Sequence, residues 1–288
     1  MAGPDDKTFL LGTGCQKGGT TWLFKYLKQS PQYVRGYMKE YHVFDALDLE
    51  SEQLTRDRIL RRAEEALIAG HQRGKVRAMP LHRLAMYGNP ELYYDYFAGL
   101  LLTRPGRVTA DMTPDYGMLS AQRLRDVREA FARRGVRTAS ILVLRDPVQR
   151  IWSHIRMQAE RFPDMFDQPL VDVLRERHTH DNYAMRTRYD HTLGALEGAF
   201  DAAHRHVAFY EELFTPERLA EICAFLGIDY VEPDLDRRRN ASGVAAGAPP
   251  PATVRLVARH FSEVYDAVAA RFPEVDLERL WPSARWVR

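Results

Sequence analysis

The sequence predicts an α/β protein in which a central, mostly parallel sheet is flanked by helices on both faces. Short apolar runs alternate along the chain with longer segments whose apolar residues recur at helical spacing. The run TASILVL, Thr138–Leu144, is largely β-branched and aliphatic, which is typical of a central parallel strand covered on both sides. Such sheets bind ligands at the carboxyl ends of their strands, so we expect function in the segments that follow the strands.

The first half of the chain supplies the opening strand and two long helices. Thr8–Gly12 is a short apolar run that ends in glycine, and Thr20–Gln29 carries apolar residues at helical spacing. A second strand is expected at Tyr33–Met38. Glu50–Ala69 is expected to form an amphipathic, largely solvated helix, and Pro90–Leu102 a helix whose proline suits the first turn.

The second half continues the alternation of strands and helices. Strands are expected at Arg107–Ala110, Thr138–Leu144 and His206–Phe209. Helices are expected from Pro147 onward and at Ser120–Arg134, Arg188–Phe200, Pro216–Leu226 and Ala252–Phe272. Ser120 suits a helix N-cap and Gly227 suits a helix stop. Arg237–Pro251 has the composition of a loop throughout.

Composition indicates an ordinary globular protein. We expect residues 1–288 to form a single domain, since an α/β sheet protein commonly reaches this length as one unit. A net charge of +2 argues against general nucleic-acid or membrane binding, although a local basic pocket is compatible with it. Cys15 and Cys223 form neither a disulfide framework nor a zinc pattern. With no export signal and no apolar stretch near the ~20 residues of a membrane span, a cytoplasmic location is expected.

The stretch LGTGCQKGGTTWLFKYL, Leu11–Leu27, resembles a phosphate-binding loop whose lysine is displaced. A nucleoside triphosphatase loop reads G-x-x-x-x-G-K-[ST], whereas here Lys17 precedes the two glycines. The order strand, glycine turn, helix places the backbone N–H groups of Gly18, Gly19, Thr20 and Thr21 at a helix N-terminus. That is a ready anion site, so the fold is expected to be P-loop-like. The alternative is a tight turn without a ligand.

Within this loop, QKGGTTW at Gln16–Trp22 resembles the phosphosulfate loop of sulfotransferases that use 3′-phosphoadenosine 5′-phosphosulfate (PAPS). The family pattern is roughly P-K-[ST]-G-T-[TS]-W, and Gln16 and Gly18 depart from it. The resemblance implies that Lys17 contacts the phosphosulfate and that Gly19, Thr20 and Thr21 hold the 5′-phosphate. The resemblance also assigns Gly18 and Trp22 to cofactor binding.

A second segment, LRDPVQRIWSHIRM at Leu144–Met157, follows the strongest strand and resembles the 3′-phosphate element of the same family. The resemblance assigns Arg145 and Ser153 to the nucleotide's 3′-phosphate. An arginine fork and a hydroxyl group suit a phosphate ester chemically. For R-D-P alone, the default interpretation would be an ion pair between Arg145 and Asp146 at a helix start.

The third segment, KEYHVFD at Lys39–Asp45, is similar to the E-x-x-F-F segment of carbohydrate sulfotransferases, including those that act on heparan sulfate. The resemblance implies that Glu40 is the general base, which an alcohol acceptor requires. Lys39 lies beside it and is assigned to the acceptor. His42 competes for the role of base, because cytosolic aryl sulfotransferases use a histidine, although theirs lies much further along the chain. An ordinary ion pair is the alternative for both residues.

The remaining assignments also depend on the resemblance. TADMTPDYG resembles an acceptor-lining strand end, which assigns Asp111 and Tyr116 to the acceptor; a strand-ending Thr-Pro turn is the alternative. Tyr189 is assigned to the nucleotide region. In the RRRNASG loop, the cofactor candidates are Arg238, Arg239 and Ser242, with a solvated arginine cluster as the alternative.

Together these segments predict a PAPS-dependent sulfotransferase that releases 3′,5′-adenosine diphosphate and needs no metal. A small-molecule, lipid or saccharide acceptor is expected, with a hydroxyl group favoured over an amine. Two other functions remain open: a P-loop kinase acting on a small molecule, and a non-catalytic nucleotide-binding module. The missing G-K-[ST] and the lack of an evident acidic strand end for magnesium argue against the kinase. A binding module would keep the loops but would not need Glu40.

Overall fold

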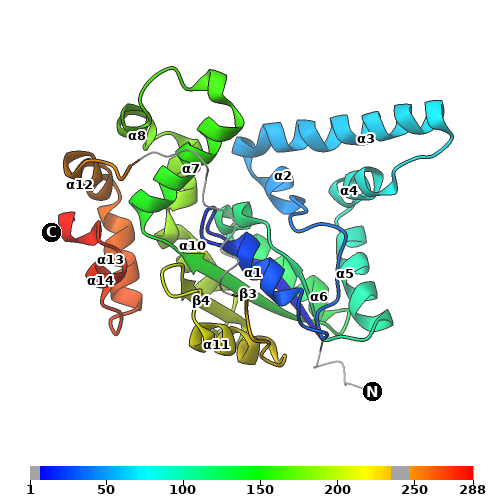
Figure 1. The fold of residues 1–288 in the computed structure, drawn as a ribbon. Helices are drawn as coiled ribbons and strands as arrows, with labels where there is room; N and C mark the ends of the chain where they lie inside the picture. The colour runs from blue at the N-terminus through cyan, green and yellow to red at the C-terminus, as the bar shows by residue number, and fades with distance from the viewer. Residues whose placement is uncertain (1–6, 235–246, 288) are drawn as a thin grey trace.

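The computed structural model describes residues 7–234 and 247–287, and its centre is a parallel sheet (Figure 1). The sheet has four strands in the order β2-β1-β3-β4. The strands are β1 (Thr8–Gly12), β2 (Val108–Asp111), β3 (Arg137–Leu144) and β4 (Arg205–Phe209). Leu11 of β1 pairs with Asp111 on one side and with Ser140 on the other, so β3 extends beyond β1 at the carboxyl edge.

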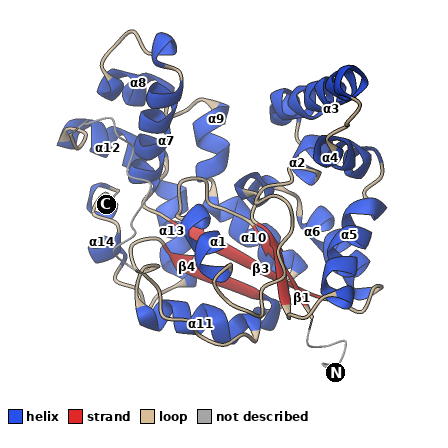
Figure 2. Cartoon of the chain, turned by 45° about the vertical axis from the view of Figure 1, so that its right-hand side comes forward, coloured by secondary structure: helices blue, strands red, loops and turns tan. Residues whose placement is uncertain are grey.

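Alternate strand residues enter two separate hydrophobic clusters, one on each face of the sheet. In β1, Phe9 and Leu11 belong to one cluster and Leu10 to the other. In β3, Leu142 belongs to the first cluster and Val143 to the second, which explains why the second half of this strand, residues 141–144, is apolar at every position. Figure 2 shows helices on both sides of the sheet, as the sequence predicts.

The helices that cover the sheet come from the whole chain. One face packs on α1 (Thr20–Leu27) and α11 (Pro216–Leu226). The other face packs on α5 (Glu91–Thr103), α6 (Ala121–Ala132), α7 (Pro147–Arg161) and α10 (Tyr189–Ala199). Peripheral helices are α2 (Phe44–Asp48), α3 (Gln53–Arg73), α4 (Ala78–Gly88), α8 (Leu170–Arg177), α9 (Asp181–Ala184), α12 (Pro251–His260), α13 (Ser262–Arg271) and α14 (Leu277–Leu280). In the described part of the chain, no helix is long and apolar enough to cross a bilayer.

Short 3-10 turns join several of these elements. They are η2 (Glu50–Glu52), η3 (Pro114–Met118), η4 (Pro163–Met165), η5 (Met185–Thr187), η6 (Ala202–His204) and η7 (Ala284–Trp286). The turn η3 follows β2 directly, so it lies at the carboxyl edge of the sheet. The long helix α3 and helix α4 pack together and lie to the right of α7 and α8 in Figure 1.

Three predicted helix boundaries are confirmed with their expected chemistry. The Ser120 hydroxyl caps α6 by accepting the N–H of Arg123 at 3.1 Å. Pro147 is the first residue of α7. Gly227 ends α11 in the left-handed region, with φ of 67°, where a residue with a side chain would be strained.

The predicted strand at Tyr33–Met38 is wrong. Only Tyr33 forms a bridge, to Val108 at the edge of the sheet. Beyond it the chain leaves that edge, because the N–H of Tyr37 contacts the hydroxyl groups of Tyr41 and Tyr96, each at 3.1 Å. Side-chain hydroxyls therefore satisfy a backbone donor that a strand would have used in its ladder.

Two predicted helices differ in extent. The segment predicted as one helix at Ala252–Phe272 forms two, α12 and α13, which meet at the buried Phe261. The segment predicted at Glu50–Ala69 begins as the turn η2 and continues in α3 to Arg73, before Gly74 at φ of 66°. Helix α4, for which we made no prediction, packs beside α3.

Candidate active site

The phosphate loop, residues 13–21, continues β1 along β3 and includes the first two residues of α1. The N–H of Cys15 donates to the carbonyl of Val143 at 2.8 Å. Gly19 then enters α1 at φ of 84°. At Gly18, an added Cβ would lie 2.7 Å from the Val143 carbonyl oxygen and 2.8 Å from the Cys15 sulfur. The local backbone therefore requires glycine at the position where the sulfotransferase pattern has Ser or Thr.

The start of α1 offers several free backbone donors. Among the described residues, no acceptor contacts the N–H groups of Gly19, Thr20 or Thr21. These groups carry the positive end of the helix dipole. Lys17 adds a half-buried ammonium, whose pKa is lowered by burial and by the charges of Arg145 and Arg161. The loop thus concentrates positive charge that an anion would neutralise.

Arg145 lies at the end of β3 and is attached to the phosphate loop. Its Nη1 donates to the Lys17 carbonyl at 2.8 Å, and its guanidinium lies 4.2 Å from the ring centre of Tyr210. Asp146 makes no ion pair with it in the described structure; instead it caps α7 by accepting the N–H of Val148 at 2.9 Å. The ion-pair alternative for this arginine is therefore wrong.

Ser153 and Tyr189 lie around Arg145. Ser153 is half-buried on α7, and its hydroxyl has no hydrogen-bond partner in the described part of the chain. The buried Tyr189 donates its hydroxyl to the Arg145 carbonyl at 2.9 Å. On α1, Trp22 stacks on Tyr26 with ring centres 5.8 Å apart. The candidates in the late loop, namely Arg238, Arg239 and Ser242, lie outside the described residues.

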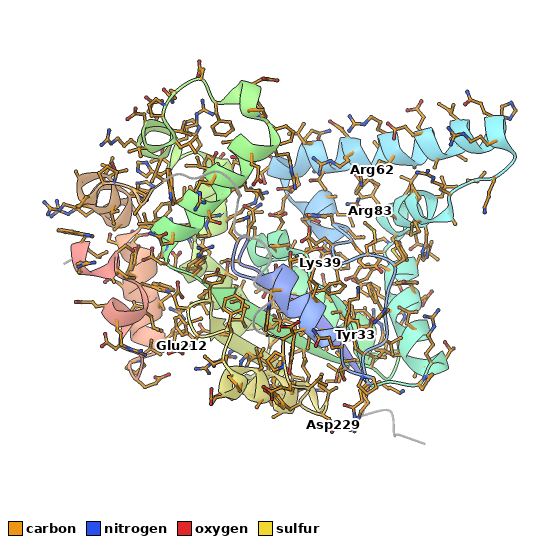
Figure 3. The ribbon with its side chains drawn as sticks, viewed as in Figure 1. Tyr33, Lys39, Arg62, Arg83, Glu212 and Asp229 are labelled. Carbon is orange, nitrogen blue, oxygen red and sulfur yellow. The ribbon has the colours of Figure 1, made fainter. Side chains whose placement is uncertain are left out.

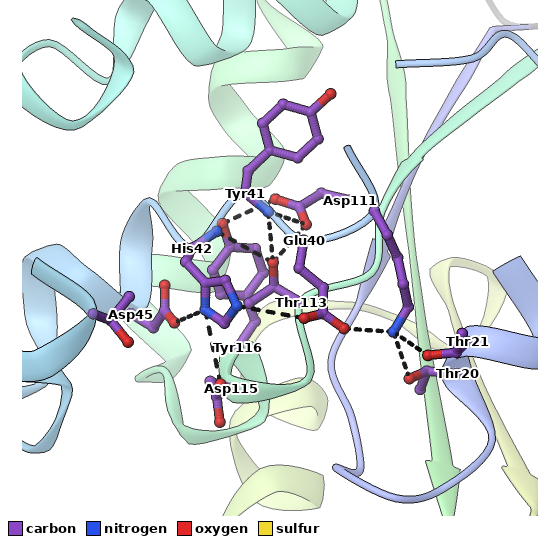
Figure 4. A network of polar contacts seen from close by, with 12 residues as sticks. Thr20, Thr21, Glu40, Tyr41, His42, Asp45, Asp111, Thr113, Asp115 and Tyr116 are labelled. Atoms are coloured by element: carbon purple, nitrogen blue, oxygen red, sulfur yellow. Dashed lines mark hydrogen bonds and ion pairs between the residues drawn. The ribbon is translucent and has the colours of Figure 1, made fainter. Parts of the chain in front are cut away.

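The predicted base belongs to a chain of charged contacts that reaches the phosphate loop (Figure 4). The ammonium of Lys39 donates to Thr21 at 2.9 Å, to Thr20 at 3.2 Å and to the Glu40 carboxylate at 2.5 Å. The other carboxylate oxygen of Glu40 lies 3.5 Å from Nε2 of His42. The structure thus brings together the phosphate loop and the segment that carries Lys39 and Glu40, which the sequence could only assign separately.

His42 is held as a cation. Its Nδ1 lies 2.6 Å from Asp45 and 3.8 Å from Asp115. Burial would lower the pKa of His42, but the hydrogen bonds with Asp45 and Glu40 outweigh it and raise this pKa to about 10. Since an imidazolium cannot accept a further proton, His42 is unsuited to act as a base near neutral pH.

Glu40 is ionised and partly accessible. Its side chain is 35% exposed, against 17% for Lys39. Burial would raise the pKa of Glu40, but His42 and Lys39 outweigh it and lower this pKa to about 2. In this arrangement Glu40 can accept a proton but is a weak base, because base strength falls with pKa.

Asp111 and Tyr116 support the segment that carries Glu40. Asp111 is fully buried and accepts hydrogen bonds from the hydroxyls of Tyr93 and Tyr116, both at 2.9 Å. Tyr116 in turn accepts the N–H of Val43 at 3.1 Å. Burial raises the pKa of Asp111 to about 6 against the lowering effect of the hydroxyls, beginning with that of Thr113. Acceptor contact by Asp111 or Tyr116 stays a prediction.

Two groupings of acidic residues bear on metal binding. Asp111 ends β2 beside β1, a strand-end carboxylate that sequence reasoning had not recognised as a magnesium candidate, but both of its oxygens already accept hydrogen bonds from protein donors. His42, Asp45 and Asp115 present ligand atoms within 4.8 Å of one another. However, Arg186 donates to Asp115 at 2.6 Å, so these residues form an ion-pair network.

Three functional candidates were missed by sequence reasoning: Asp45, Asp115 and Arg186. The spacing of three between His42 and Asp45 was the one local signal, since the segment leads into α2. Asp115 and Arg186 come from η3 and η5 and meet only in the folded chain. A cavity of about 490 Å³ between η3, α10 and α13 contains none of the predicted site residues.

Comparisons with known proteins give the family and the fold. A family model described as "Sulfotransferase family" matches residues 10–233. A solved sulfotransferase from Alicyclobacillus acidocaldarius has a TM-score of 0.59 and 18% identity, with 100% of each chain covered. This likeness shows a shared fold, which is the predicted P-loop-like α/β architecture.

Two further solved structures have lower TM-scores. A sulfotransferase from Mycobacterium avium has a TM-score of 0.48 and 15% identity over 92% of this chain and 77% of that one. The sulfotransferase domain from the curacin biosynthetic pathway has a TM-score of 0.45 and 16% identity over 86% and 82%. No curated protein matches the chain significantly. Because the family model spans most of its length, the chain belongs to the sulfotransferase family.

Proposed function

We propose that this protein transfers the sulfuryl group of PAPS to a hydroxyl group of a small-molecule, lipid or saccharide acceptor, with an amine as the second choice. One observation carries the proposal: the Lys39 ammonium contacts both the hydroxyls of Thr20 and Thr21, two residues whose amides are free, and the carboxylate of Glu40. An anion-binding group and a proton acceptor are thus adjacent, as transfer from an anionic donor to an alcohol requires.

Two sets of residues fit the two ends of the donor. The amides of Gly19, Thr20 and Thr21, with Lys17, suit the 5′-phosphosulfate. Arg145 and Ser153 suit the 3′-phosphate, because one is fixed to the loop and the other has an unoccupied hydroxyl. The link between Arg145 and the Lys17 carbonyl supports a single donor spanning both sets.

In the proposed reaction, the acceptor oxygen forms a bond to sulfur as the bond between sulfur and the bridging phosphate oxygen breaks. Glu40 takes the acceptor's proton, and 3′,5′-adenosine diphosphate leaves. Lys17 and the loop amides stabilise the negative charge that develops on the bridging oxygen. His42 and Asp45 keep the Glu40 carboxylate in place through ion pairs.

The test is an assay with sulfur-labelled PAPS and fractionated small-molecule extract. We expect label in an acceptor fraction, with release of 3′,5′-adenosine diphosphate. Lys17→Ala should lower turnover by about 10²–10³, the typical cost of losing one donor to developing negative charge. Lys25→Ala is the matched control, because Lys25 is exposed on α1, the helix that follows the loop.

Two results would reject the proposal. One is a Lys17→Ala variant that keeps nearly all turnover. The other is a wild-type protein that binds ATP with magnesium and shows no affinity for 3′,5′-adenosine diphosphate in calorimetry, which would favour the kinase alternative. Glu40→Gln that retains both nucleotide binding and full turnover would remove Glu40 from the mechanism.

A further inference from the structure

Lys39 connects two parts of the site that lie on different elements. Its backbone carbonyl accepts the N–H of Met112 at 2.8 Å, which fixes the chain beside the end of β2. Lys39 is labelled in Figure 3, and its side chain reaches Thr20 and Thr21 at the start of α1 (Figure 4). Its third partner is the neighbouring Glu40 carboxylate. The Lys39 ammonium therefore contacts both the phosphate loop and the proposed base, Glu40.

The partners of this ammonium differ in strength. Two are neutral hydroxyls, and one is a carboxylate. Thr20 and Thr21 also supply free N–H groups, so an anion bound at these amides would lie next to the Lys39 ammonium. A charge-assisted hydrogen bond is roughly twice as strong as a neutral one, so such an anion would compete with Glu40 for Lys39.

We propose, on the basis of the function proposed above, that Lys39 couples donor binding to the activation of Glu40. The bound phosphosulfate attracts the Lys39 ammonium and weakens its contact with the Glu40 carboxylate. Before the donor binds, the carboxylate keeps both cationic neighbours, Lys39 and His42, with Asp45 and Asp115 behind His42. Once the donor is bound, the Glu40 carboxylate loses most of its contact with Lys39. The base is then strongest when the donor is in place.

The direction of the effect on Glu40 follows from its surroundings. Lys39 is one of the groups that lower the pKa of this carboxyl against the effect of burial. Weakening that contact raises the pKa, which makes the carboxylate a better proton acceptor. Coupling is reciprocal, so the charge of Glu40 must also weaken donor binding.

Reciprocity can be tested by binding alone. We would measure the affinity for 3′,5′-adenosine diphosphate by calorimetry in wild type, Lys39→Met, Glu40→Gln and the double variant. Lys39→Met should weaken binding about tenfold, the loss of one charge-assisted contact. Glu40→Gln should tighten binding about threefold or more, because Lys39 is then free for the phosphate. In the double variant, the gain from Glu40→Gln should disappear.

The cycle separates this coupling from other causes. If Glu40→Gln tightens binding equally with and without Lys39, simple repulsion between the carboxylate and the nucleotide explains the gain, and the coupling is wrong. If Lys39→Met lowers the melting temperature without changing affinity, Lys39 is a structural ion-pair partner. Lys25→Met removes the same charge as Lys39→Met but from α1, and it should leave the affinity for the nucleotide within about twofold. Wild-type protein that fails to bind the nucleotide would instead reject the proposed function.

Discussion

At the scale of single residues, the site divides two tasks between two side chains: His42 carries a positive charge, and Glu40 is the proposed proton acceptor. His42 carries positive charge because Asp45 lies against its Nδ1, and Glu40 carries negative charge because Lys39 and His42 flank it. The proton acceptor is therefore defined by its neighbours. Asp45 has no direct contact with Glu40 and acts through the imidazolium, as a positioning residue.

The charge on His42 predicts how stability depends on pH. Its folded pKa of about 10 lies above its ordinary value of 6.5, so its stabilisation is complete below pH 6.5. As pH rises from 6.5 to about 10, the contribution of His42 to the free energy of unfolding of the wild type should fall, by at most about 1.4 kcal/mol per pH unit. Asp45→Asn should lose less over the same interval. Urea unfolding at pH 6 and pH 10 measures both.

Asp48→Asn is the control for this comparison. Asp48 belongs to α2, the same short helix as Asp45, and pairs with Arg123 at 2.7 Å. Arginine keeps its charge across this pH range. Its loss should lower stability equally at both pH values. If Asp45→Asn shows the same pH dependence as wild type, His42 does not owe its charge to Asp45.

At the scale of elements, the sheet and its loops could be predicted because their signals are local. The apolar run of β3, the cap of α6 and the glycine after α11 each depend on a few neighbouring residues. The segment Tyr33–Met38 could not be judged this way, because the N–H of Tyr37 is taken by the hydroxyl of Tyr96, which lies far away in the sequence. The Asp115–Arg186 pair was missed for the same reason, since η3 and η5 meet only after folding.

The phosphate loop itself yields a prediction. Gly18→Ser would place a Cβ against the backbone carbonyls of Val143 and Cys15, and backbone atoms cannot yield as a flexible side chain can. We expect a loss of about 1–3 kcal/mol in unfolding free energy and weaker binding of 3′,5′-adenosine diphosphate. Gly99→Ala in α5 is the control, because open space surrounds that position and the helix should gain about 0.5–1 kcal/mol. Unchanged binding by Gly18→Ser would show that the loop relaxes freely.

At the scale of the whole molecule, the C-terminal segment supports the nucleotide elements from a distance in sequence. Ser283 donates its hydroxyl to Asp146 at 2.6 Å, and Asp146 caps the helix that carries Ser153. Trp281 is fully buried and donates its Nε1–H to Glu211 at 3.1 Å, after β4. The hydrophobic cluster that contains Phe9 of β1 also contains Trp281. Both ends of the described chain thus share one core.

A shared core predicts that residues 1–288 unfold as one unit. Calorimetry should show a single transition, and saturating 3′,5′-adenosine diphosphate should shift all of it upward, by about 2.7 kcal/mol at a hundredfold excess over Kd. Trp281→Ala should lower the free energy of unfolding by about 3–5 kcal/mol while keeping one transition. The half-buried Trp286 is the control, since its replacement by alanine should cost less. Two wild-type transitions, with only one moved by the nucleotide, would show that the C-terminal helices form a separate unit and that their contacts with Asp146 contribute little to the site.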